Sequence, residues 1–122
     1  MIAEEATKCI DQAVLHEFRN IVKKYGPTYN SEHEGYAVLL EEVEEACEAA
    51  EFMQDALKRL WTSIRQNEFS NFELSQVRGF ARALINEAVQ VTAVCERFME
   101  TVKKNAEVKS RETTYREDKT IL

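Results

Sequence analysis

Residues 33–51 read HEGYAVLLEEVEEACEAAE, and the spacing of their side chains decides the expected fold. Apolar residues recur every three or four positions, which is the period of an α-helix with one buried face. Just before this stretch, Ser31 and Glu34 form the S-x-x-E pattern of a capping box, which marks a helix start. The pattern predicts one long helix from Ser31 to about Gln66, and a kink or break near Met53 is an open alternative. The residues expected to face the core are Leu39, Val43, Ala46, Ala50, Met53, Leu57, Leu60, Trp61 and Ile64.

Two further helices are expected, at residues 3–25 and 72–104. The first ends at Gly26-Pro27, because glycine accepts the left-handed conformation of a helix cap and proline cannot continue a helix. Three helices of this size bury a modest core. We therefore expect an all-α protein, an antiparallel bundle of three main helices that forms one domain over residues 1–104 and is completed by oligomerisation. Residues 103–122 are half charged, and residues 105–122 are expected to form a mobile tail.

The cellular setting is inferred from what the sequence lacks. No apolar run approaches the length of about 20 residues that a membrane-spanning helix needs, so no membrane partner is expected. The first residues, MIAEEATKC, lack the basic and apolar regions of a signal peptide. The three cysteines Cys9, Cys47 and Cys95 are far apart, and we expect buried free thiols in a reducing compartment. These features together predict a cytoplasmic protein.

Charge is distributed unevenly along the chain. The net charge is −6, yet residues 25–57 contain nine acidic side chains and no lysine or arginine. The rest of the chain therefore carries a net charge of +3. An acidic field repels nucleic-acid backbones and attracts cations. We expect no nucleic-acid partner, and the acidic segment becomes a candidate cation site.

The acids lie on one side of the central helix. At about 100° per residue, Glu41, Glu45 and Glu48 share a stripe, Glu42 lies at its shoulder, and the apolar positions face away. One explanation is a solvated face, which is the usual place for charge. The other is a bound cation. Like charges one turn apart repel, and no basic residue in the segment relieves them, which favours the cation. Several carboxylates on one face suit Mg²⁺, which prefers oxygen ligands.

The helix order and the stretch HEGYAVLLEEVEEACEA resemble the MazG-like, all-α nucleoside triphosphate pyrophosphohydrolase superfamily. That superfamily also holds the phosphoribosyl-ATP pyrophosphatases and the all-α dUTPases. Its hallmark is EExxE on one helix and ExxD on the next. Glu41, Glu42 and Glu45 match the first motif. Glu87 begins the second, but Gln90 stands where the family has aspartate.

The resemblance covers roughly residues 18–98 and implies a function. It implies hydrolysis of a nucleoside triphosphate or related nucleotide to the monophosphate and pyrophosphate, with Mg²⁺ as cofactor and Mn²⁺ as an alternative. It also implies a homodimer or homotetramer. The metal ligands that it implies are Glu41, Glu42, Glu45 and Glu87. The first three of these are also the candidate catalytic residues. The candidate auxiliary residues are Glu48, Gln90, His33 and Lys103.

The departure at Gln90 keeps other functions open. Glutamine carries no charge and cannot act as a base, although its carbonyl oxygen can coordinate a metal. One alternative is a catalytically degenerate helical oligomer of the same fold that acts as a binding or regulatory module. A further alternative is an unrelated helical bundle whose acids are merely solvated, which predicts that divalent metals leave the stability unchanged.

Overall fold

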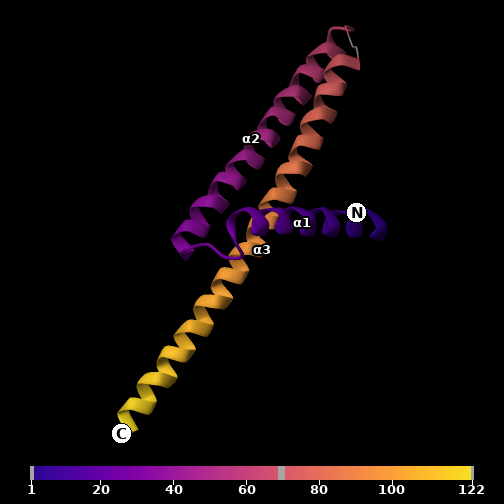
Figure 1. Ribbon diagram of the computed structural model, residues 1–122. Coiled ribbons are helices and arrows are strands. Elements are labelled where there is room, and N and C mark those ends of the chain that lie inside the picture. The colour runs from indigo at the N-terminus through magenta and orange to yellow at the C-terminus, as the bar shows by residue number, and fades with distance from the viewer. Residues whose placement is uncertain (1, 69–70, 122) are drawn as a thin grey trace.

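The computed structural model is all-helical over the residues that it describes, 2–68 and 71–121, with side chains described up to residue 114. The helices are α1 (Glu4–Tyr25), α2 (Glu32–Arg65) and α3 (Asn71–Ile121). They pack against one another as Figure 1 shows, which confirms the expected all-α class. α2 is a single helix, so the break considered near Met53 is absent from it. None of the described helices is long and apolar enough to cross a membrane.

The turn between α1 and α2 is fixed at both ends by the residues that the sequence indicates. Gly26 has a φ of +92°, and its backbone N–H donates to the carbonyl oxygen of Val22 at 2.8 Å. At the start of α2, the Ser31 Oγ accepts a hydrogen bond from the backbone N–H of Glu34 at 3.1 Å. The Glu34 carboxylate in turn accepts a bond from Asn30 Nδ2 at 3.0 Å. These local bonds end one helix and begin the next.

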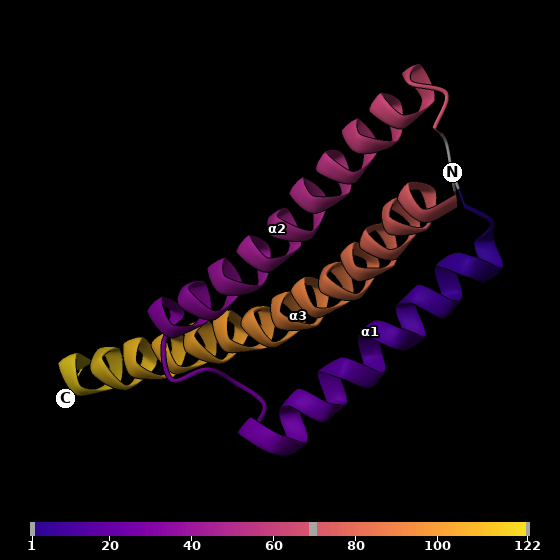
Figure 2. The same ribbon diagram turned by 90° about the horizontal axis from the view of Figure 1, so that it is seen from above.

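α3 is the central helix. α1 and α2 pack against different sides of it (Figure 2), and within the described ranges no close backbone contact joins α1 to α2. The beginning of α2 lies against the middle of α3, where Gly35 meets the ring of Phe98. The end of α2 lies near the beginning of α3, where Ser63 Oγ donates to Glu73 Oε1 at 3.0 Å. α3 thus sets the position of both other helices.

The face of α2 that packs against α3 differs from the expected one. The buried residues of α2 are Gly35, Ala49 and Ala56, and Glu42 is half-buried beside them. Small side chains allow two helices to approach closely, so larger apolar residues are displaced to the flank. The expected core face is therefore wrong for several of its members. Four of them are between 38% and 58% exposed: Val43, Leu57, Trp61 and Ile64.

Two further expectations are corrected. α3 continues to Ile121 instead of ending near Lys104. No glycine or proline follows Gly79, so the sequence holds no strong helix breaker there. The mobility of residues 105–122 stays a prediction.

The expected burial of thiols is wrong for Cys9 and Cys47, which are exposed, while Cys95 is half-buried.

Candidate metal centre

Three carboxylates from two helices converge. Glu42 and Glu45 lie about one turn apart on α2, and Glu87 comes from α3. One carboxylate oxygen from each residue lies within 4.8 Å of the other two. Glu42 and Glu87 are half-buried, and Glu45 is exposed. We call these three residues the carboxylate cluster. Its all-oxygen donor set is the kind that hard divalent cations prefer.

Two contacts between α2 and α3 hold the cluster in register. On one side, Gly35 packs so closely against Phe98 that an added Cβ atom would lie 2.9 Å from the ring. On the other side, the rings of Phe52 and Phe80 are 5.5 Å apart at an interplanar angle of 37°. Because the cluster lies between these contacts, sliding α2 along α3 requires both to break. The alignment of the carboxylates follows from the packing of the two helices.

The electrostatics of the carboxylate cluster favour a cation. Burial raises the pKa of Glu42 above its ordinary value, and the negative charges of Glu45, Glu87 and Glu41 raise it further. Both effects disfavour the ionised form, because the charge loses water and gains like-charged neighbours. A divalent cation reverses both, since it supplies opposite charge and takes carboxylate oxygens as ligands.

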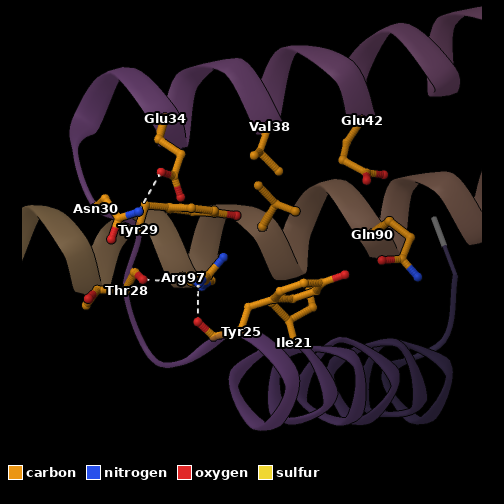
Figure 3. A pocket seen from close by; sticks show the side chains of 11 residues that line it. Ile21, Tyr25, Thr28, Tyr29, Asn30, Glu34, Val38, Glu42, Gln90 and Arg97 are labelled. Carbon is orange, nitrogen blue, oxygen red and sulfur yellow. Dashed lines mark hydrogen bonds between the residues drawn. The ribbon is translucent and has the colours of Figure 1, made fainter.

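A pocket of about 560 Å³ adjoins the carboxylate cluster and shares Glu42 with it. Residues of α1, α2, α3 and the turn between α1 and α2 form its walls (Figure 3). Its volume lies in the range of roughly 300–1,000 Å³ that is usual for small-molecule sites. Its other lining residues are Ile21, Tyr25, Thr28, Tyr29, Asn30, Glu34, Val38, Gln90, Val94 and Arg97.

The turn after α1 forms one wall of the pocket, and Arg97 holds this turn in place. Its side chain is 6% exposed, and its guanidinium donates to the carbonyl oxygens of Tyr25, Gly26 and Thr28 at 3.0–3.1 Å. The guanidinium carbon also lies 4.1 Å from the centroid of the Tyr29 ring. A buried charge is tolerated where hydrogen bonds and an aromatic face replace water. Arg97 is therefore a positioning residue that fastens this turn to α3.

Tyr29 is the second buried polar group of the pocket. It is 5% exposed, and its backbone N–H donates to Thr101 Oγ1 at 2.9 Å. Its hydroxyl points into the pocket (Figure 3), and no group in the described part of the chain completes a hydrogen bond with it. Burial raises the pKa of Tyr29, an effect that the nearby positive charge of Arg97 partly offsets. A buried hydroxyl without a partner costs about 1–3 kcal/mol.

Gln90 lies beside the carboxylate cluster but is bonded elsewhere. Its side-chain amide donates to Glu17 Oε2 on α1 at 2.9 Å. Its carbonyl oxygen is turned towards the pocket (Figure 3). Gln90 thus ties α1 to α3 at the edge of the pocket, and one of its two polar atoms is already engaged.

The other candidate site residues from the sequence lie outside the carboxylate cluster. Glu41 and Glu48 are exposed on α2 and are not members of the cluster, although the charge of Glu41 acts on Glu42. His33 lines a different hollow, between the first turn of α2 and the later part of α3. Lys103 lines an apolar hollow beside Phe98. Three of the four implied metal ligands are therefore brought together, and Glu41 is not among them.

Sequence reasoning missed Tyr29, Arg97 and Glu17. The one local signal for Arg97 is a charged residue that follows Val94 by about one turn, inside the apolar pattern of α3. A buried arginine at such a place indicates backbone carbonyl partners. Tyr29 and Glu17 carry no comparable local signal, because their roles depend on residues far along the chain.

Comparisons of the chain with protein-family models, with curated proteins and with solved structures find no significant match. The resemblance to the MazG-like superfamily therefore stays a prediction. What the structure contributes is the position of the carboxylate cluster beside a pocket of small-molecule size.

Proposed function

We propose that the protein is a Mg²⁺-dependent nucleotide pyrophosphohydrolase, which cleaves a nucleoside triphosphate or related nucleotide to the monophosphate and pyrophosphate. The observation that carries the proposal is the convergence of Glu42, Glu45 and Glu87 next to a pocket of about 560 Å³. The match of residues 41–45 to the EExxE motif supports it independently.

The donor set of the carboxylate cluster fits a hard metal ion. Mg²⁺ takes oxygen ligands, keeps several waters and bridges to phosphate oxygens. When bound, such an ion neutralises phosphate charge and polarises the reacting phosphorus. We assign Glu42, Glu45 and Glu87 as its ligands, with Mn²⁺ as an alternative metal. Glu41 lies outside the cluster, although its charge acts on Glu42, and we propose that one of these carboxylates accepts a proton from the attacking water.

The pocket fits the nucleoside part of such a substrate. Tyr25, which is 63% exposed, supplies an aromatic surface on which a base can stack. The Gln90 carbonyl oxygen points into the pocket and can accept a hydrogen bond from a base or sugar. Glu42 lines both the pocket and the cluster, so a nucleoside in the pocket has its phosphates beside the metal ligands.

The test is metal-dependent release of pyrophosphate. Purified protein is incubated with a panel of canonical and modified nucleoside triphosphates, with and without Mg²⁺ or Mn²⁺. We expect turnover only with metal, and Glu42→Gln should lower it by about 100-fold, since even outer-shell partners of a metal contribute roughly 10- to 100-fold.

Asp55→Asn is the matched control. It makes the same change of acid to amide on an exposed residue of α2 outside the cluster, and it should retain wild-type turnover. The absence of metal-dependent turnover across the panel would contradict the proposal, as would equal losses in Glu42→Gln and Asp55→Asn.

A second candidate function is a non-catalytic binding or regulatory module of the same fold. The observation that favours it is Gln90, which replaces the aspartate of the family motif and is bonded to Glu17. This candidate predicts that Mg²⁺ and nucleotide bind without pyrophosphate release. Isothermal titration with Mg²⁺ and a non-hydrolysable nucleotide analogue separates it from the solvated-acid alternative, which predicts no binding.

We also propose an antiparallel bundle that assembles as a homodimer or homotetramer. The contacts of Gly35 with Phe98 and of Ser63 with Glu73 support the antiparallel course of α2 and α3. The exposure of Leu57, a residue expected in the core, supports assembly with further subunits.

A further inference from the structure

The pocket beside the carboxylate cluster has two ends of different composition (Figure 3). One end holds Gln90 and Glu42, and it joins the cluster through Glu42. The other end lies where the turn after α1 meets the first turn of α2, and it holds Asn30 and Glu34. We call the end at Asn30 and Glu34 the far end. Glu34 precedes Glu42 by eight residues, so the two lie about 12 Å apart along α2.

The carboxylate of Glu34 does not perform the local task that its place in α2 favours. In a capping box, the glutamate at this position accepts a hydrogen bond from the backbone N–H of the capping residue. Here Ser31 Oγ accepts from the backbone N–H of Glu34, but the Glu34 carboxylate accepts from Asn30 Nδ2 at 3.0 Å instead. Within the described residues, this carboxylate makes no other hydrogen bond and no ion pair. Its second oxygen, Oε1, is therefore open to a ligand.

A carboxylate in this setting selects hydrogen-bond donors. Glu34 is half-buried and is directed from α2 towards the pocket (Figure 3), so its charge has lost part of its hydration without gaining a cation. An ionised carboxylate can only accept hydrogen bonds. The bond from Asn30 holds one oxygen in place and so orients the group. The best ligand for such a carboxylate brings two donors side by side, because bidentate bonds to a charged group are strong.

Guanine is the nucleobase whose edge offers two adjacent donors, the ring N1–H and the 2-amino group. Adenine and cytosine each have an acceptor ring nitrogen beside their amino group, and uracil and thymine have one N–H between two carbonyl oxygens. Proteins commonly read bases along these edges. An acceptor that faces a carboxylate leaves both groups unpaired, which a site built for donors rejects. The far end therefore matches guanine better than the other bases.

We propose that Glu34 selects guanine nucleotides by accepting hydrogen bonds from N1–H and the 2-amino group of the base. The inference rests on the proposed function, because the carboxylate cluster then holds the phosphates and directs the base to the far end. The distance of about 12 Å between Glu42 and Glu34 along α2 is comparable to the length of a nucleoside monophosphate. Tyr25 offers its exposed ring to the face of the base.

The test measures binding, so it does not require turnover. Isothermal titration in Mg²⁺ uses analogues of GTP, ITP and ATP in which a CH₂ group replaces the oxygen between the α and β phosphates. ITP is a close match, since it differs from GTP only in lacking the 2-amino group. The wild type should bind the GTP analogue about 10- to 100-fold more tightly than the ITP analogue, because one hydrogen bond to a charged group is lost. The ATP analogue should bind more weakly than the GTP analogue.

Glu34→Gln should bring the affinities for the GTP and ITP analogues within about threefold of each other, since a neutral amide replaces the charged acceptor. The control is Glu32→Gln, which makes the same change on an exposed residue of the same turn outside the pocket. It should keep the preference of the wild type for guanine.

The xanthosine triphosphate analogue supplies a test by gain of binding, which a misfolded variant cannot pass. Xanthine keeps N1–H but has a carbonyl oxygen in place of the 2-amino group. That oxygen faces the wild-type carboxylate unfavourably, whereas the amide of Glu34→Gln can donate to it. The variant should therefore bind this analogue more tightly than the wild type does.

The outcomes separate this inference from the proposed hydrolysis. Equal affinity of the wild type for the GTP and ITP analogues would overturn the role of Glu34, and so would the absence of binding or an equal loss of preference in Glu32→Gln. Release of pyrophosphate from all four nucleotides with equal affinities would overturn guanine selection alone. A guanine preference that depends on Glu34, without release of pyrophosphate from GTP, would support guanine selection and contradict the hydrolysis.

Discussion

At the scale of single residues, Tyr29 shows how a buried group can be poorly satisfied in the free protein. Its hydroxyl has no hydrogen-bond partner within the described residues. Tyr29→Phe removes a hydroxyl that has lost water without gaining a bond. We therefore expect the free energy of unfolding at neutral pH to stay the same or to rise by about 1 kcal/mol. Urea denaturation measures the change, and a loss larger than that amount would show a bonded hydroxyl.

The same residue predicts a pH dependence. Burial raises the pKa of Tyr29 in the folded chain above the ordinary value of 10.0. The unfolded chain then loses this proton first, so the free energy of unfolding falls as pH rises from 10.0 through the folded pKa, and this loss is absent at lower pH. Tyr29→Phe should therefore lose less of its free energy of unfolding at alkaline pH than the wild type does.

Urea denaturation at about pH 8 and about pH 11, on either side of the ordinary tyrosine pKa, isolates the effect. The control is Tyr36→Phe, because Tyr36 is 61% exposed. The free energy of unfolding of this variant should fall between the two pH values as much as that of the wild type. If the free energy of unfolding fell equally in Tyr29→Phe and in the wild type, the raised pKa of Tyr29 would be contradicted.

The sequence alone singles out Glu42 and Glu45 for a local reason, whereas Glu87 follows from the resemblance to the second family motif. An EExxE motif places carboxylates about one turn apart on any helix, and the missing basic residues mark them as unusual. Arg97 could not be assigned in this way. Its partner Tyr25 lies 72 positions away, and the bond exists only because α1 and α3 meet there.

At the scale of elements, the sequence predicts both ends of α1 and α2 well, but it misses the end of α3 and the packed face of α2. The ends of α1 and α2 agree within a residue, because Gly26 and Ser31 act on their own neighbours. The prediction of which face of α2 packs against α3 was wrong, because this helix has apolar residues on more than one side. Periodicity shows that those sides exist, but it does not show which one α3 covers.

Gly35 tests the closest approach between α2 and α3. An alanine favours a helix by about 1 kcal/mol over glycine. At Gly35, however, the added Cβ would lie 2.9 Å from two carbons of Phe98, whose ring packs edge-on against Tyr29 at 6.2 Å. Overpacking costs about 1–3 kcal/mol, so the clash should exceed the helix gain and Gly35→Ala should destabilise the protein by about 1 kcal/mol.

Gly79→Ala is the matched control for this prediction. Gly79 lies within α3, and an added Cβ there would meet no heavy atom within 4 Å. Its substitution should raise the free energy of unfolding by up to about 1 kcal/mol. Urea denaturation of both variants gives the comparison. A gain of stability in Gly35→Ala equal to that in Gly79→Ala would show that Phe98 moves aside freely.

At the scale of the whole molecule, α1 is the element with the fewest attachments. It contacts α3, and in the described ranges it makes no close backbone contact with α2. Its C-terminal end is held by Arg97, and its middle is joined to α3 by the bond between Glu17 and Gln90. The pocket therefore depends on a wall that packs against α3 alone, through the buried Val14 and a few polar contacts. Such an element can open separately from the rest of a fold.

Arg97→Ala should release α1 while α2 and α3 stay paired. The substitution removes hydrogen bonds to three backbone carbonyls, and we expect a loss of about 3 kcal/mol, because each bond to a charged group contributes roughly 1.5–3 kcal/mol and neighbouring bonds are not additive. Hydrogen exchange followed by mass spectrometry should show faster exchange in α1 and in the turn after it. Arg82→Ala, an exposed arginine of α3, should leave exchange unchanged. Equal acceleration in all three helices would mean that the chain opens as one cooperative unit, and the pocket wall would then be as stable as the α2–α3 pair.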